Sequence, residues 1–110
     1  MELTSINVIS SKLVEYVARL AVGLSVDESD LRRITGSVLY PIVREAVNRV
    51  AGEIVTTRNG LLRCNICGKG PFTRRGLYLH LIRVHRYDII GYVEDEYNKI
   101  IKIIGLDKKY

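Results

Sequence analysis

The sequence has no long hydrophobic run that is free of charge. Its apolar region at residues 6–24 is interrupted by Lys12, Glu15 and Arg19, and no basic segment precedes that region. The interruptions exclude a membrane span, and the missing basic segment argues against a secretory signal. We find no internal repeat and no low-complexity segment. We therefore expect a cytoplasmic protein that is globular along most of its length, since 47% of its residues are apolar.

Acidic residues are missing from the middle of the chain. Residues 54–87 contain no aspartate or glutamate, whereas residues 1–53 have six basic and seven acidic side chains and residues 88–110 have four and five. The net charge of +5 therefore comes from the middle segment, whose seven basic residues are Arg58, Arg63, Lys69, Arg74, Arg75, Arg83 and Arg86. Such a segment favours a polyanionic partner, and nucleic acid is the obvious candidate.

Apolar residues at spacings of three and four predict amphipathic helices in the N-terminal half. The first stripe predicts a helix over residues 4–22 and consists of Ile6, Ile9, Leu13, Val17, Leu20 and Leu24. Asp27 can cap a second helix, because its side-chain oxygen can accept from free backbone N–H groups of the first turn. Pro41 lacks a backbone N–H and should kink or restart this helix, which then continues to about Gly52.

The rest of the chain predicts a β-hairpin and one more helix. Residues 54–57 are rich in β-branched side chains, and they precede Asn59-Gly60, a strong hairpin signal. Asp88 can cap the last helix and Gly105 can end it. The apolar face of this helix, which we expect to dock on the N-terminal helices, consists of Ile89, Val93, Tyr97, Ile100 and Ile104.

These patterns predict an α+β, mainly α fold with three units. A helical unit, with a possible role in dimerisation, occupies residues 1–53. The hairpin and the motif that follows it occupy residues 54–87, and a C-terminal amphipathic helix occupies residues 88–110.

The chain has only two cysteines and two histidines, and all four lie in one short window. They read Cys64-x2-Cys67-x12-His80-x4-His85, a spacing within the range of a tetrahedral zinc site. Two residues between the cysteines allow a tight turn that points both sulfurs at one ion. Two unrelated thiols with two ordinary histidines, or a redox Cys-x2-Cys site, are the alternatives. The clustering of all four residues in one 22-residue window, in metal-ligand order, argues against coincidence. We predict one structural zinc ion, because four protein ligands leave no open position for a substrate.

Residues 62–85 resemble the two-cysteine two-histidine zinc finger family. Leu62 precedes the first cysteine at the family's first core position, Gly68-Lys69 follows the second cysteine, and Leu77 stands three residues before His80. The family's aromatic residue is displaced by one position, to Phe72. The resemblance implies a ββα fold for this segment. The usage of Ile, Val, Arg, Lys and Tyr also resembles that of heat-adapted archaeal or archaeal-virus chains.

The resemblance places possible base contacts along the helix that carries His80. The matching positions are Thr73, Arg75, Gly76 and Leu79, of which only Arg75 is a strong base reader. The other predicted nucleic-acid contacts go to phosphates and come from Arg74, Arg83, Arg86, Lys69, Arg63 and Arg58.

The sequence therefore predicts a zinc-binding, DNA-binding transcriptional regulator. An RNA-binding or ribosome-associated protein and a protein-interaction adaptor are the alternatives. We expect no enzyme activity and no small-molecule substrate, because no nucleophile and base stand out. A homodimer formed through the N-terminal helices is also expected, since one finger covers only about three base pairs and a unit this small leaves apolar faces uncovered.

Overall fold

The computed structural model describes residues 2–105, with side chains from residue 11 onward. The elements follow the order α1 (Glu2–Val22), α2 (Glu28–Thr35), α3 (Tyr40–Glu53), β1 (Val55–Arg58), β2 (Leu61–Cys64), α4 (Arg74–Val84) and α5 (Arg86–Ile104). This confirms the predicted α+β, mainly α class. None of the described helices is long and apolar enough to cross a membrane.

The helix cap at Asp27 and the helix start next to Pro41 lie where the sequence predicts them. The Asp27 side chain accepts a hydrogen bond of 3.0 Å from the backbone N–H of Ser29 and so caps α2. Pro41 lies in the first turn of α3, so the chain restarts a helix there and does not kink one. A proline costs nothing in a first turn, because the backbone N–H that it lacks would have no partner inside the helix.

The buried face of α1 is centred beside the predicted stripe. Val17 of the predicted stripe is fully buried, as are Val14 and Ala18, whereas Leu13 and Leu20 of the stripe are half-buried. Ile6 and Ile9 lie outside the residues whose side chains the structure describes.

The hairpin has the predicted turn. Arg58 pairs with Leu61 across antiparallel strands. Asn59 and Gly60 between them have φ angles of 55° and 78°. Positive φ at both positions is the pattern of the tight turn that Asn-Gly favours, and it matches the natural twist of the two strands.

The start of α5 differs from the prediction. The helix begins at Arg86, and His85 is the residue that precedes it. Asp88, the predicted cap, lies inside the first turn, where its carboxylate contacts the ring of His85. The prediction failed because α4 and α5 share His85 as their boundary residue, so no separate turn remains for Asp88 to cap. Gly105 ends α5 as predicted, in a left-handed conformation with φ of 81°.

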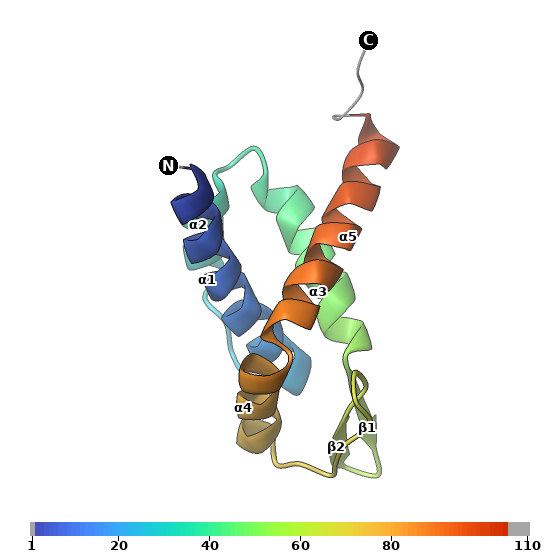
Figure 1. The fold of residues 1–110 in the computed structure, drawn as a ribbon. Helices are drawn as coiled ribbons and strands as arrows, with labels where there is room; N and C mark the ends of the chain where they lie inside the picture. The colour runs from blue at the N-terminus through green and yellow to red at the C-terminus, as the bar shows by residue number, and fades with distance from the viewer. Residues whose placement is uncertain (1, 106–110) are drawn as a thin grey trace.

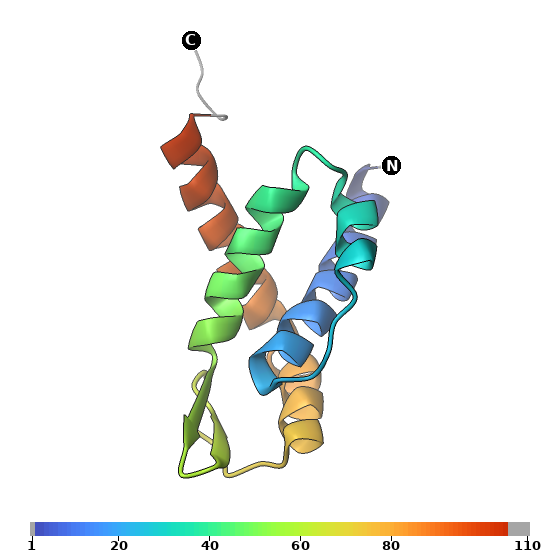
Figure 2. The same cartoon turned by 180° about the vertical axis from the view of Figure 1, so that it is seen from behind.

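The helices and the hairpin share one core. Figure 1 shows the hairpin and α4 at one end of the molecule, with the start of α1 and the end of α5 at the other. Seen from behind, α3 lies between α1 and α5 (Figure 2). Helix α4 packs against α1, and Leu77 and Leu81 of α4 are fully buried. The α5 helix packs mainly on α3. The three-unit division of the chain stays a prediction.

Candidate metal centre

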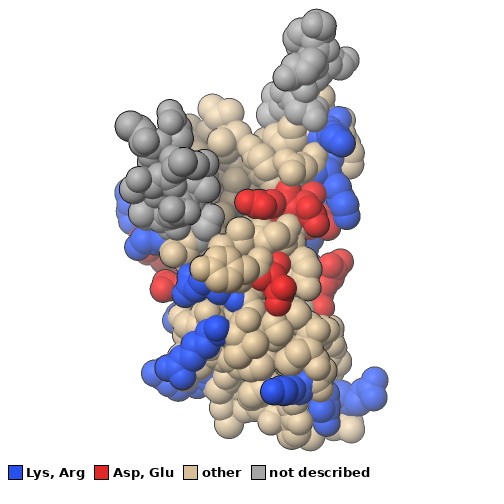
Figure 3. Space-filling model, viewed as in Figure 1, with Lys and Arg blue, Asp and Glu red and all other residues tan. Residues whose placement is uncertain are grey.

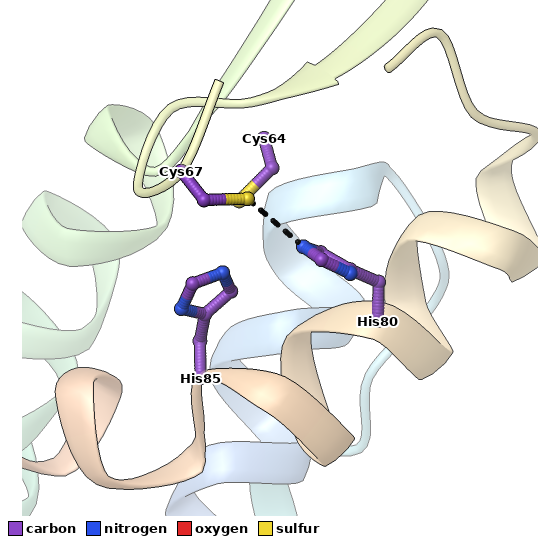
Figure 4. A group of neighbouring side chains, drawn as sticks. All are labelled: Cys64, Cys67, His80 and His85. Atoms are coloured by element: carbon purple, nitrogen blue, oxygen red, sulfur yellow. Dashed lines mark hydrogen bonds between the residues drawn. The ribbon is translucent and has the colours of Figure 1, made fainter. Parts of the chain in front are cut away.

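Four elements of the chain bring the two cysteines and the two histidines together. Cys64 ends β2, Cys67 lies in the turn that follows, His80 lies on α4, and His85 joins α4 to α5. One ligand atom from each residue can be chosen so that all four lie within 4.8 Å of one another. Figure 4 shows the two sulfurs facing the two imidazole rings. The predicted set of four is therefore assembled, and it could hold a metal ion.

The turn between the cysteines is closed by backbone hydrogen bonds. The N–H of Gly68 donates to the carbonyl of Cys64 over 2.8 Å, and the N–H of Cys64 donates to the carbonyl of Lys69 over 2.9 Å. Gly68 has a φ of 82°, a conformation that a side chain would strain. The glycine is what lets the chain bend tightly enough to bring the Cys67 sulfur back toward Cys64.

Asn65 anchors this turn to the end of α3, a role that the sequence analysis missed. Its backbone N–H donates to the carbonyl of Ile54, and its side-chain amide donates to the carbonyl of Glu53, each over 2.9 Å. Thr56 donates from its hydroxyl to the side-chain oxygen of Asn65. Asparagine next to a turn often satisfies backbone groups in this way, but the sequence does not reveal that the partner is the end of a helix.

His80 is positioned by an aromatic neighbour. Its Nε2 atom lies 3.3 Å from the sulfur of Cys67. The ring of Phe72 lies 4.8 Å from the ring of His80, centroid to centroid. Phe72 reaches it because its backbone N–H donates to the carbonyl of Leu62 over 2.8 Å, which adds a short third segment beside β2. The displaced aromatic residue therefore packs directly against a predicted metal ligand.

His85 provides the test of whether a metal fits this site. The side chain is buried, and its Nδ1 atom lies 2.8 Å from a carboxylate oxygen of Asp88. Its Nε2 atom is buried and has no hydrogen-bond partner among the described residues. A buried polar atom without a partner is costly. A metal ion bound between the cysteines and histidines would satisfy it, so the residues present fit a metal site.

The two thiols have different acidities in this structure. The backbone N–H of Lys69 and then the nearby rings of His85 and His80 lower the pKa of Cys67 to about 6. Burial raises the pKa of Cys64. Burial by itself would lower the pKa of His85, but the Asp88 carboxylate and the nearby Cys67 sulfur outweigh it and raise that pKa. Cys67 therefore loses its proton more easily than Cys64 and forms the thiolate, which is the form that binds metal.

Thiolate and imidazole ligands in a set of four suit zinc. Structural zinc sites are tetrahedral, and two cysteines with two histidines are one of their common ligand sets. Here the set joins the turn after β2 to α4 and to the start of α5, so a bound ion would connect the hairpin with both helices.

The predicted nucleic-acid contacts fall into two groups. Three of them make contacts within the protein. The Thr73 hydroxyl accepts from the N–H of Gly76 and caps α4, Arg74 donates from Nε to the carbonyl of Val22 over 2.8 Å, and Arg86 contacts Ser11 over 3.5 Å. The other five are exposed and extend from the hairpin, the turn and α4: Arg58, Arg63, Lys69, Arg75 and Arg83.

The fold and the site define a mainly helical protein with a candidate two-cysteine, two-histidine metal centre. No protein-family model, no curated protein and no solved structure matches the chain.

Proposed function

We propose that the chain is a zinc-binding protein that binds nucleic acid, with DNA as the favoured partner, and that it acts as a transcriptional regulator. The observation that carries the proposal is the unneutralised charge around the metal centre. None of the seven basic residues of the acid-free segment forms an ion pair within the described part of the chain. In Figure 3 the end of the molecule with the hairpin and α4 carries basic but no acidic side chains.

Zinc has a structural role in this proposal. With four protein ligands it has no position left for a substrate or a reactive water. A bound zinc ion would fix the hairpin, α4 and the start of α5 relative to one another. We therefore propose a binding protein and not an enzyme.

Most contacts in this proposal go to phosphates. Arg58, Arg63, Lys69 and Arg83 are exposed and can neutralise phosphate charge, which makes the affinity fall with salt. Arg75, in the first turn of α4, is the best candidate for a contact to a guanine edge.

RNA is the second candidate partner, and one observation favours it. Of the four positions along α4 that could read bases, Thr73 has its hydroxyl engaged as a helix cap, and Gly76 and Leu79 offer no side-chain hydrogen bonds. Recognition by shape and phosphate contacts suits structured RNA. A role as a protein-interaction adaptor, with the charge incidental, is the remaining alternative.

The test is a binding titration with labelled duplex DNA, structured RNA and a neutral polymer over a salt series. We expect both nucleic acids to bind, DNA more tightly, with affinity that falls linearly with salt on logarithmic axes. Arg83→Glu should weaken binding to both, whereas Lys102→Glu, an exposed charge on α5 outside the basic segment, should not. Tighter binding to RNA would select the second candidate. Absence of binding to either nucleic acid would refute the proposal.

A further inference from the structure

Tyr87 is exposed to an extent that the fold does not explain. Its side chain is 82% exposed, more than any other large hydrophobic side chain that the structure describes. Val84, three residues earlier, is 61% exposed. Both lie at the junction where α4 ends and α5 begins. Neither side chain contributes appreciably to the core, so their stabilising role in the folded chain is small.

The surroundings of Tyr87 are basic. Arg83, four residues earlier and on α4, is exposed, and Arg86, the preceding residue, lies 3.5 Å from the hydroxyl of Ser11 on α1. The nearest acidic residue in the sequence is Asp88. Its carboxylate contacts His85 over 2.8 Å and therefore serves the metal site. An aromatic ring thus projects from a surface whose neighbouring arginines favour phosphate.

The junction that carries Tyr87 is held firmly. His85 is buried, its backbone N–H donates to the carbonyl of Leu81, and its own carbonyl accepts from the N–H of Ile89, so it belongs to both helices. Its ring contributes to the metal centre. The backbone that carries Tyr87 is therefore fixed relative to the backbone that carries Arg83 and Arg86.

We propose that Tyr87 stacks on an unpaired base of a nucleic acid whose phosphates contact Arg83 and Arg86. This inference rests on the proposed function and specifies the form of its partner. An aromatic face beside basic side chains is the chemistry that binds single strands, because every base offers a face for stacking. A base inside a duplex already stacks on both neighbours, so the base that Tyr87 contacts must be unpaired and lie in a single strand, a loop or a bulge beside the phosphates that the arginines contact.

A protein partner suits this surface less well. The centre of a protein interface is depleted of charged residues, whereas here two arginines flank Tyr87 and Val84. The other two most exposed apolar side chains lie elsewhere, Val38 before α3 and Ile103 at the opposite end of α5. The apolar part of the surface is therefore one ring and one small side chain, which suits a base.

The test uses the fact that the chain contains no tryptophan. In Tyr87→Trp the new residue is a unique fluorescent probe. We expect its emission to be quenched by a thymidine oligonucleotide, but not by an abasic oligonucleotide of the same length and charge. Tyr92→Trp is the matched control, because Tyr92 lies further along α5, beside Glu53 and Asn65, and should not respond.

Affinities of Tyr87 variants complete the test. Tyr87→Ala should weaken binding of the thymidine oligonucleotide by roughly fivefold or more, Tyr87→Phe should keep it, and binding of the abasic strand should be unchanged in both. If both strands bind the wild-type chain equally and Tyr87→Ala changes neither, the inference is wrong while nucleic-acid binding stands. If neither strand binds and duplexes and structured RNA also fail, the inference and the proposed function fall together.

Discussion

A contact of 2.8 Å joins Nδ1 of His85 to a carboxylate oxygen of Asp88, the residue in the first turn of α5 that faces it. An ionised carboxylate can accept a hydrogen bond but cannot donate one, so in this contact the proton is on Nδ1. Nε2 is then the nitrogen that is free to bind metal. The start of α5 is thereby linked to the metal site.

The first prediction concerns this contact. Asp88→Asn should weaken zinc affinity by about 10- to 100-fold, because an uncharged partner orients His85 less firmly and makes it a poorer ligand. Competition with a calibrated chelator measures the affinity. Asp95→Asn, an exposed carboxylate further along α5, is the control and should change nothing. Equal affinities for the two variants would show that Asp88 does not act on the metal.

The second prediction concerns metal removal. Cys64 belongs to the core that α1, α3, α4 and α5 share, and His85 is also buried. Since a structural zinc site contributes on the order of 10 kcal/mol to folding, chelation should lower the melting temperature of the whole chain and reduce its helical circular dichroism. Added zinc should restore both, and magnesium should not. An unchanged melting curve after chelation, with metal content verified as zero, would contradict a structural role.

The third prediction concerns pH. The pKa of Cys67 is lowered to about 6, first by the backbone N–H of Lys69, so its thiolate is present above that pH and is lost as the pH falls. The raised pKa of His85 acts in the same direction, because the ring gains a proton on acidification. Zinc affinity should therefore fall with decreasing pH, and more steeply below about pH 6. Titrations at several pH values measure this. A constant affinity across this range would show that neither group ligates the metal.

The fourth prediction concerns the packing of α4 on α1. Leu81 is fully buried, and Leu81→Ala should lower the free energy of unfolding by about 2–5 kcal/mol. Val84→Ala, on the same helix but with 61% of its side chain exposed, should cost less than about 0.5 kcal/mol. Denaturant unfolding of the zinc-loaded chain measures both. Similar values for the two variants would mean that Leu81 is not packed in the core in solution.

The fifth prediction concerns assembly. A unit that binds DNA as one zinc finger does covers about three base pairs, so we propose that two chains pair through their N-terminal helices. The mass in solution should then be twice the 12.5 kDa of one chain. Light scattering with and without a short duplex measures it. A mass of one chain in both conditions would show that the protein acts as a monomer.

Much of the local structure follows from the sequence because its causes are local. Asp27 caps α2 through a neighbour two residues away, Asn59-Gly60 forms the tight turn, and Gly105 ends α5. The metal site is predictable for a related reason. Ligand spacing along a turn and a helix fixes which atoms can meet, so the four predicted residues are the four that the structure brings together.

Other relationships depend on which surfaces meet in the folded chain. Arg74, predicted from its charge to contact nucleic acid, donates to the carbonyl of Val22, which is 52 positions away. Asn65 donates to the end of α3, and Asp88 contacts a metal ligand where a helix cap was expected. In each case a polar side chain has several possible partners, and proximity in the fold selects one.

The class of fold, the hairpin and the four candidate ligands are predictable from the sequence, because spacing, turn chemistry and apolar periodicity act over a few residues. The packing of α1 on α4, the sharing of His85 by two helices and the exposure of Tyr87 depend on the folded arrangement. Those features depend on which apolar faces pack against one another. The hydrophobic effect has no direction, so a local sequence pattern does not specify which faces will pack together.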